Sequence, residues 1–589
     1  MKKLFAMLLV VALVVAMAAG CSEKSNNPGA TKASVNPKTA EEIAAAEAEI
    51  RYAIGLLLDR NYIVNQISQA GEMPANTFVA DGMADINGTN FAKNSNGGKG
   101  YFSVEEGDYS ANAKEGFEIL QKYYDWDGKK FVGFPKLTYI YNTNDNHQKI
   151  GEYIQSTLAK YGITVELQNQ EWATFLDTRK QGNYSVARNG WVADYTDPIC
   201  FLDMWVTASG NNDVQFGKGS HKDLAVYNLD LTDLGIEVKV EKGTWAETYD
   251  VLIAEIKACT DAEKRSELMH IAEDMLMATG CLTPIYYYTD PYMISSSVEG
   301  FYSIPLGYKY FQNTTVNGKG DSIAVCLASE PDSLDPALNS AVDGATMLVH
   351  LFAGLAKWVE KDGQQVLVAD CAEELVEGVV NEDGTVTYTY TLKSGMKWSD
   401  GKVVTAKDFE FAWKRAASAE LGADYGYMFE VVKGYEEGEL AVKAIDAKTL
   451  EVTIANTITY WNELLAFPTY FPVREDVVSN EAWATDPSTY VCNGPYTLSA
   501  WEHNSVITLT KNANYHGAAD VTMNEIKCYL SDDAANMLTN FKNGDWQLID
   551  DVPSAEIPNL KSNPEFVIAG QMGTYYVCWN INESLPPKK

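Results

Sequence analysis

A strand–helix–strand pattern over residues 134–172 constrains the fold of this chain most. The run FPKLTYIYNTND predicts a strand, HQKIGEYIQSTLAKYG predicts a helix that ends at Gly162, and ITVELQNQEW predicts a second strand. Two strands joined by a helix of this length pair in parallel through a right-handed crossover. The sequence therefore predicts an α/β fold built on a parallel sheet.

The rest of the first half combines predicted helices with a loop-rich stretch between Gly71 and Phe134. At 589 residues, the whole chain is too long for one core, so we expect two or three domains. Thr39 and Glu42 form a capping box that opens a helix, and a shorter helix covers residues 61–70. Residues 248–280 predict two helices broken near Thr260, followed by an extended run over residues 281–295.

The second half is richer in antiparallel strands. After the turn residues Asp383 and Gly384, TVTYTYTLKSG alternates with period two, which is typical of a hairpin strand. Thr405 caps a further helix, and residues 444–456 and 496–512 predict further hairpins. A short polar linker, NTTVNGKGDS (residues 313–322), separates the two halves.

The first 21 residues predict a targeting signal. Two lysines precede an apolar run that ends in Ala-Ala-Gly before Cys21, and a polar tether (residues 22–40) follows. Small residues directly before a cysteine resemble a bacterial lipoprotein cleavage site, which implies lipidation of Cys21 and an extracytoplasmic, membrane-anchored protein. The alternative is an ordinary secretory signal with a chance cysteine.

Charge excludes one class of partner. The chain has 46 Lys+Arg against 80 Asp+Glu, a formal net charge of −34, so a phosphate backbone would be repelled and no nucleic-acid partner is expected. The eight cysteines after Cys21 show no CxxC pair and no zinc-ligand spacing, and most lie in apolar runs. We expect unpaired buried thiols, no metal and no cofactor.

Residues 142–198 concentrate the side chains suited to holding a zwitterionic ligand. VARNGWVADYTDP places Arg188, Trp191 and Asp194 on a strand end and the loop after it, where open α/β sheets bind ligands. A carboxylate can hold an ammonium group, guanidinium groups can hold a carboxylate, and tryptophan faces can form pocket walls.

This segment, NQEWATFLDTRKQGNYSVARNGWVADYTDP, resembles the ligand-cleft segment of the oligopeptide-binding proteins of ABC importers (extracellular solute-binding protein family 5). The segments WSDGKVVTAKDFEFAW, NGPYTL and LDP resemble the same family, and the resemblance covers nearly all of the mature chain. It implies a periplasmic-binding-protein type II-like fold, with a cleft between two lobes and a third, antiparallel-rich subdomain at about residues 353–467.

The resemblance also implies roles for individual residues. Asp194 matches the residue that pairs with the α-amino group of a peptide, and Trp191 matches a pocket wall beside it. Ser68 stands where some members carry a lysine, which weakens any inference about the preferred peptide length. The other residues implied to line the ligand site are Trp172, Arg179, Arg188, His147, Tyr288, Tyr425 and Asn580.

Ordinary structural roles compete with these assignments. An aspartate after a strand is often a turn former or a helix cap, and tryptophans at such spacings are often core residues. His147 alone would suit a solvated position near the start of the following helix. The long match around Asp194, Trp191 and Trp172 favours the ligand site for those three.

The two halves stand in the reverse of the family's order, which predicts a circular permutation. Residues 41–288 correspond to the family's second half and residues 289–589 to its first half plus an edge. Termini that lie close together tolerate such a change, so the helix from Thr39 and Pro587 should meet in space. We also expect one covalent crossing between the lobes, near Tyr288. Recombination between tandem genes, engineering and an assembly error are alternative origins.

The sequence thus predicts the substrate-binding component of an ABC importer, a monomer that delivers short peptides to a permease. A nickel chelate, an oligosaccharide or haem is an alternative ligand, and a permuted relic without transport is an alternative role. A hydrolase is not expected, because no GxSxG or HExxH motif occurs and the six histidines are scattered.

Overall fold

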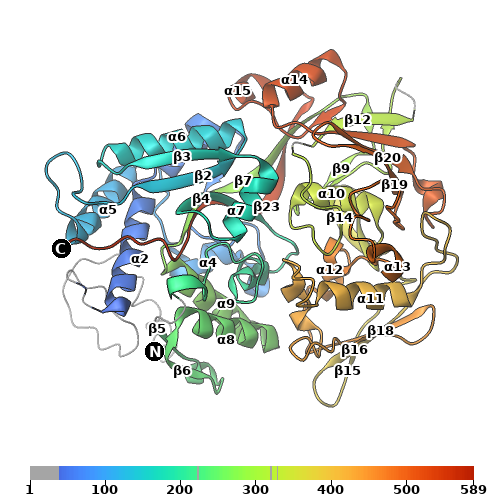
Figure 1. Ribbon diagram of the computed structural model, residues 1–589, viewed down its shortest axis with the longest axis horizontal. Helices are drawn as coiled ribbons and strands as arrows, with labels where there is room; N and C mark the ends of the chain where they lie inside the picture. The colour runs from blue at the N-terminus through green and yellow to red at the C-terminus, as the bar shows by residue number, and fades with distance from the viewer. Residues whose placement is uncertain (1–36, 38, 222–224, 319–320, 328) are drawn as a thin grey trace. The chain divides into compact units, whose positions relative to one another are not determined.

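The computed structural model describes residues 37, 39–221, 225–318, 321–327 and 329–589. The predicted signal peptide, Cys21 and most of the tether lie outside these residues. The chain divides into two compact units, each drawn in Figure 1. Unit 1 comprises Met1–Ala193, Asp197–Tyr288 and Met572–Lys589, and unit 2 comprises Asp194–Thr196 and Thr289–Gln571.

Unit 1 contains the predicted strand–helix–strand pattern as three neighbouring elements, β2, α6 and β3 (Figure 1). Strand β2 pairs in parallel with β3 and with β4, which confirms the parallel sheet, and β4 pairs antiparallel with β23. The strands of unit 1 are β1 (Met73–Pro74), β2 (Leu137–Asn142), β3 (Val165–Gln170), β4 (Val186–Val192), β5 (Ala225–Asp230) and β6 (Lys239–Thr244).

Four helices of unit 1, at residues 40–56, 145–159, 245–258 and 262–277, lie close to their predicted positions, whereas the helices at residues 91–98, 109–123 and 172–180 were not predicted. Thr39 caps α2 through a complete capping box with Glu42. The short helix after it is an α-helical turn that continues as a π-helix over Ile63–Ser68. The break near Thr260 separates α8 from α9. The helices are α2 (Ala40–Leu56), α3 (Arg60–Tyr62), α4 (Phe91–Gly98), α5 (Tyr109–Tyr123), α6 (Asp145–Ala159), α7 (Trp172–Lys180), α8 (Trp245–Ala258) and α9 (Ala262–Met277).

Unit 2 is built on two larger sheets and several short hairpins. Strand β12 lies between β21 and β22, in parallel with both, and β19 and β20 extend the sheet antiparallel. The antiparallel sheet β15–β16–β18–β17 packs against α11, which the predicted Thr405 cap begins. This sheet and helix lie within residues 353–467, the segment expected to form a third subdomain. The division into two units leaves this segment inside unit 2.

The strands of unit 2 are β8 (Val298–Glu299), β9 (Tyr302–Ser303), β10 (Lys309–Tyr310), β11 (Thr315–Val316), β12 (Ser322–Cys326), β13 (Ala356–Lys361), β14 (Gln364–Ala369), β15 (Val379–Val380), β16 (Val386–Thr391), β17 (Val442–Ala444), β18 (Thr449–Ile454), β19 (Tyr496–Glu502), β20 (Val506–Lys511), β21 (Glu525–Tyr529) and β22 (Leu548–Ile549). Its helices are α10 (Val342–Leu351), α11 (Ala406–Ala416), α12 (Trp461–Leu464), α13 (Glu475–Val478), α14 (Ala534–Asn543) and α15 (Ile557–Leu560). The core beneath α11 is aromatic and contains Trp413, Trp461 and Tyr470.

Two long strands carry the chain between the units, which corrects the expectation of a single crossing. Strand β7 (Leu282–Ile294) leaves unit 1 after Tyr288, and β23 (Phe566–Trp579) returns to unit 1 at Met572. Met572–Lys589 therefore belongs with unit 1 and not with the second lobe. The reason is that β23 extends the unit 1 sheet by pairing Gly573 to Trp579 with β4.

Candidate functional site

The candidate site in unit 1 lies at the carboxyl ends of its parallel strands. Strands β2 and β3 end side by side at Asn142 and Gln170, which are register partners, and β4 ends at Val192. Ligands of open α/β sheets bind at this edge, because loops and helix starts there leave polar groups uncommitted. Asn144 caps α6 by accepting hydrogen bonds from the main chain of Asn146 and His147, so His147 is the third residue of the helix.

Arg188 is the centre of an aromatic cluster in unit 1. Its guanidinium donates to Oη of Tyr288 at 3.1 Å and lies 5.3 Å from the centre of the Tyr575 ring. Tyr575 stacks on Tyr286 at 4.7 Å, and its ring centre lies 5.5 Å from that of His147. We call these five residues the Arg188 cluster. It brings together three of the predicted residues, His147, Arg188 and Tyr288.

The electrostatics of the cluster keep His147 neutral. Burial lowers the pKa of His147 well below its usual value, and the positive charge of Arg188 lowers that pKa further. The side chain of His147 is buried, so the alternative prediction of a solvated position for this histidine is wrong. Burial also raises the pKa of Tyr288, so its hydroxyl stays protonated and can donate to a ligand while it accepts from Arg188.

Several buried polar atoms at this edge have no hydrogen-bond partner among the described residues. They include donors as well as acceptors, and polar groups left in this state cost about 1–3 kcal/mol each unless water or a ligand satisfies them. Such a set is what a polar ligand would complete. The atoms are Nδ1 of His147, Nε of Arg188, Nε1 of Trp172, Oδ1 of Asn142 and Oε1 of Gln170.

A close approach of main chain to side chain makes glycine necessary beside Arg188. A Cβ atom at Gly190 would lie 2.1 Å from Oη of Tyr288, and one at Gly573 would lie 2.7 Å from Cδ2 of the same ring. Gly190 pairs with Tyr575 and Gly573 pairs with Val192 in the β4–β23 ladder, and the absence of side chains at both glycines leaves room for the Tyr288 ring. The glycine in VARNGWV is thus explained by packing.

Two predicted residues are committed to other contacts. Nε of Arg179 lies 2.7 Å from Oδ2 of Asp213, and both side chains are buried. The Asn580 side chain donates to the carbonyl of Gly182 at 2.6 Å and accepts from the main chain of Asn582 at 2.9 Å. These contacts give Arg179 and Asn580 structural roles, and we leave both out of the site proposed below.

The two predicted tryptophans differ in their surroundings. Nε1 of Trp191 donates to the carbonyl of Cys200 at 3.0 Å, which fixes the orientation of its ring. Trp172 begins α7 and stacks loosely on Phe175, with 6.1 Å between ring centres. Trp172 therefore offers a partly exposed face and a free indole donor, whereas Trp191 offers only a wall.

Asp194 and Tyr425 lie together in unit 2. Oη of Tyr425 donates to Oδ1 of Asp194 at 3.0 Å. Burial raises the pKa of Tyr425 well above its usual value, and the negative charge of Asp194 raises that pKa further, so this hydroxyl is a permanent donor. The predicted pairing partner of an ammonium group is thus a buried carboxylate held by a tyrosine.

Sequence reasoning missed Tyr286, Tyr575 and Glu463. The first two stand in runs of adjacent tyrosines, YYY and TYYV: alternation in a strand puts Tyr286 on the same face as Tyr288, and one tyrosine of the second run on the site face. Glu463 accepts from the main chain of Thr196 at 2.8 Å and from its hydroxyl at 2.6 Å. No local signal marks this glutamate, because its partner is distant in sequence.

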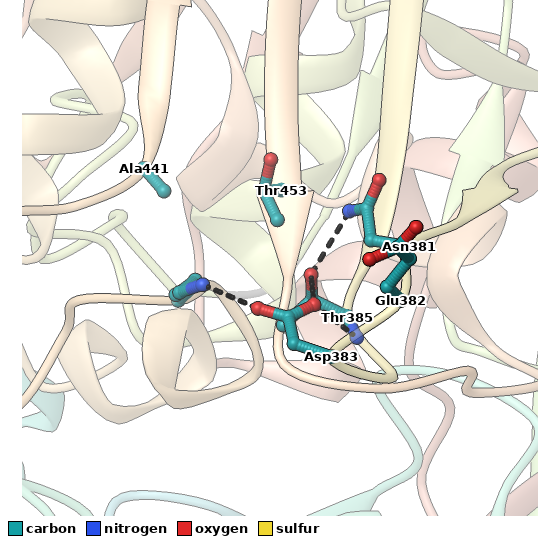
Figure 2. Close-up of a pocket in the computed structure, with 7 residues that line it drawn as sticks. Asn381, Glu382, Asp383, Thr385, Ala441 and Thr453 are labelled. Atoms are coloured by element: carbon teal, nitrogen blue, oxygen red, sulfur yellow. Dashed lines mark hydrogen bonds and ion pairs between the residues drawn. The ribbon is translucent and has the colours of Figure 1, made fainter.

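Unit 2 also has a polar hollow of about 410 Å³ at one end of the sheet β15–β16–β18–β17 (Figure 2). Figure 2 shows Asp383 beside Thr385. Asp383 accepts from the Thr385 hydroxyl at 2.6 Å and from the Lys433 cation at 3.0 Å. These groups satisfy one another, and none of the predicted site residues lines the hollow. Its remaining lining residues are Asn381, Glu382, Ala441 and Thr453.

Three further features concern the described residues alone. Among them, no helix combines the length and the apolar character needed to cross a membrane. No group of three or more potential metal ligands occurs in this part of the chain. Its eight cysteines are all free thiols, and seven of them are buried.

Comparison with known proteins identifies the family. The profile of the bacterial extracellular solute-binding proteins, family 5, matches residues 21–213 and 367–589, well over half of the chain. The oligopeptide-binding protein OppA of Bacillus subtilis is 32% identical over 292 residues, which cover 46% of this chain and 52% of that protein. The probable deoxycholate-binding periplasmic protein YgiS of Escherichia coli is 32% identical over 274 residues, covering 44% and 49%.

Solved structures match over a similar share. OppA of Burkholderia pseudomallei is 29% identical, with a TM-score of 0.38, and the match covers 41% of this chain and 48% of that one. The chain thus spans about half the length of the curated relatives it matches. The family profile, together with the mixed α/β architecture, confirms the predicted fold class. The chain belongs to family 5 of the bacterial extracellular solute-binding proteins.

Proposed function

We propose that this protein is the substrate-binding component of an ABC importer and that it captures short peptides for a membrane permease. Membership of the family supports a binding role, and relatives named for binding oligopeptides and dipeptides support a peptide ligand. The observation that carries the proposal is the Asp194 carboxylate, buried and oriented by Tyr425. A carboxylate is the group that pairs with a cation in proteins, and the α-ammonium of a peptide is such a cation.

Within unit 1, the Arg188 cluster offers hydrogen-bond donors that suit a peptide. A peptide has carbonyl oxygens along its backbone and a carboxylate at its end, and both accept hydrogen bonds. Arg188 is a permanent donor, Tyr288 has a protonated hydroxyl, and Trp172 has an indole N–H without a partner among the described residues. Tyr286 and Tyr575 are buried and stack on each other, and the Tyr575 ring supports the Arg188 guanidinium.

Calorimetric titration tests the ligand class. We expect a mixture of tri- to pentapeptides to bind, and a nickel chelate, an oligosaccharide and haem to give no heat. Asp194→Ala should weaken peptide binding at least tenfold, because the ammonium group loses its counter-charge. A hydrogen bond to a charged group contributes about 1.5–3 kcal/mol. Unchanged peptide affinity in this variant, or tight binding of one of the other solutes instead, would overturn the proposal.

We further propose that Cys21 is lipidated and that the chain is a circular permutant of the family. The cleavage-site pattern before Cys21 supports the anchor. The main chain of Leu585 donates to Glu47 in α2 at 2.8 Å, which supports the permutation, since it attaches the last residues to the first described helix. Growth on a peptide as sole amino-acid source, with and without the gene, separates a transporting permutant from a relic that folds without transport.

A further inference from the structure

Three residues of the loop after β4 are held by unit 2. Asp194–Thr196 belongs to unit 2, whereas Ala193 before it and Asp197 after it belong to unit 1. Within unit 2, three contacts fix the three residues one by one. Asp194 accepts from Tyr425, the Tyr195 ring stacks on Tyr460 at 4.5 Å and 10°, and Thr196 donates twice to Glu463.

Glu463 holds the main chain of this loop as well as a side chain. One carboxylate oxygen accepts from the N–H of Thr196 at 2.8 Å, and the other accepts from the Thr196 hydroxyl at 2.6 Å. Two hydrogen bonds to one carboxylate fix both the position and the rotation of the peptide unit two residues after Asp194. Glu463 lies in α12, two residues after Trp461, whose ring is buried in the unit 2 core.

The residue after Thr196 is fixed with equal firmness in unit 1. Arg265 of α9 donates to both carboxylate oxygens of Asp197, at 2.9 and 3.0 Å, and Asp197 also accepts from the main chain of Ile199. Thr196 and Asp197 are therefore consecutive residues with separate two-point attachments. The loop around Asp194 has little freedom of its own, and its geometry depends on these side chains.

We propose that Glu463 is a positioning residue for ligand recognition: through Thr196 it sets the carboxylate of Asp194 for a ligand ammonium group. The inference rests on the proposed peptide-binding function. It assigns part of the selectivity for a free amino terminus to a residue that itself does not touch the ligand, and it identifies Thr196 as the link between the two.

The test compares a free and a blocked amino terminus. The probe is the tightest-binding member of a tri- to penta-alanine series together with its N-acetylated form, titrated into the full chain. We expect Glu463→Ala and Thr196→Val to reduce the preference for the free amine by about fivefold to tenfold, the scale of a hydrogen bond to a charged group. Thr196→Ser keeps both hydrogen bonds and should retain the preference.

Glu463→Gln separates positioning from charge. A glutamine can accept from the Thr196 N–H through its oxygen and donate to the Thr196 hydroxyl through its nitrogen, so it keeps both contacts and removes the charge. We expect less than a threefold loss of preference for Glu463→Gln. A loss equal to that of Glu463→Ala would show that the charge acts directly, which overturns the positioning role.

Hydrogen exchange gives a readout that does not need a ligand. The amide of Thr196 should exchange at least tenfold faster in Glu463→Ala and at an unchanged rate in Glu463→Gln. Unchanged exchange in Glu463→Ala would also overturn the inference. Absence of any preference for the free amine in the unsubstituted protein would overturn the proposed role of Asp194 and this inference with it, whereas a preference lost in Asp194→Asn but kept in Glu463→Ala would overturn the inference alone.

Discussion

The main-chain N–H of Leu585 donates to Oε1 of Glu47 at 2.8 Å, so the last residues of the chain are attached to the second turn of α2. The attachment continues at Lys588 and Lys589, whose amides both donate to the carbonyl of Tyr123 at the end of α5. The last segment of the chain is thus attached to two helices of unit 1, α2 and α5.

Replacing Glu47 tests this attachment. Glu47→Ala leaves the amide of Leu585 without its acceptor, so we expect a loss of about 1–3 kcal/mol in the free energy of unfolding. Glu47→Gln retains an acceptor oxygen and should cost less than about half as much. Urea unfolding measures both variants, and limited proteolysis should release the last residues faster in Glu47→Ala only. Equal stability of the two variants would contradict the role given to this contact.

Joining the ends gives a stronger test of chain order. A variant that links Lys589 to Thr39 through a short Gly/Ser segment and opens the chain within residues 313–318 reverses the proposed permutation. Residues 315–316 form only the two-residue strand β11 there. We expect this variant to fold with a melting temperature within a few degrees of the original, as compact domains with adjacent termini tolerate permutation. Circular dichroism and calorimetry check it, and failure to fold would contradict the permutation.

Asp274 should make stability depend on pH. Burial raises its pKa to about 6, although Tyr101 donates to it at 2.7 Å. The folded state therefore binds the proton more tightly than the unfolded state. Its contribution to stability is present below pH 4 and is lost as the pH rises through 6, on the order of 3 kcal/mol in total.

Two variants isolate this contribution. Asp274→Asn keeps an acceptor for Tyr101, so it should match the original at pH 4 and exceed its free energy of unfolding at pH 7. Asp85→Asn is the matched control with the opposite sign. Hydrogen bonds from His270, Ser266 and Asn94 outweigh burial and lower the Asp85 pKa, so this change should destabilise the protein at pH 7. Parallel pH profiles for Asp274→Asn and the original would contradict the assignment.

Local chemistry made much of the fold predictable. The capping boxes at Thr39 and Thr405 and the period-two run over residues 386–391 lie where they were expected, since each depends on neighbours in sequence. The ending of the chain did not follow from such signals. Strand β23 returns to unit 1 because its Gly573 to Trp579 pair with β4, a partner almost 400 residues away in the sequence.

The candidate site shows the same limit. The types of residue were readable from the sequence, and His147, Arg188 and Tyr288 do lie together. The commitment of Arg179 to Asp213 was not readable, because a guanidinium suited to a ligand is equally suited to a buried carboxylate. Whether such a residue is available is a property of packing and not of local pattern.

Arg179 should therefore behave as a structural residue. Arg179→Met leaves the buried Asp213 without its counter-charge, which should cost about 3–5 kcal/mol in the free energy of unfolding. Adding Asp213→Asn should recover part of that loss, because it removes the unpaired buried charge. Asn189 donates to Asp213 at 3.0 Å, and the side-chain oxygen of an asparagine at position 213 can still accept this hydrogen bond. Peptide affinity of the folded double variant should change less than threefold. A large loss of affinity without a loss of stability would place Arg179 at the ligand instead.

Gly190 tests the geometry of the Arg188 cluster. Gly190→Ala sets a methyl group 2.1 Å from Oη of Tyr288, so the ring must move and its hydrogen bond with Arg188 must lengthen. We expect a loss of about 1–3 kcal/mol in stability, the usual cost of overpacking, and weaker peptide binding. Gly570→Ala is the control. Gly570 lies in β23, as Gly573 does, and a Cβ atom at Gly570 meets no other atom within 4 Å. The double variant Gly190→Ala with Tyr288→Leu removes the clashing hydroxyl and should regain stability without regaining affinity, since the Arg188 contact is lost either way. Recovery of affinity in that variant would show that Tyr288 acts only as packing.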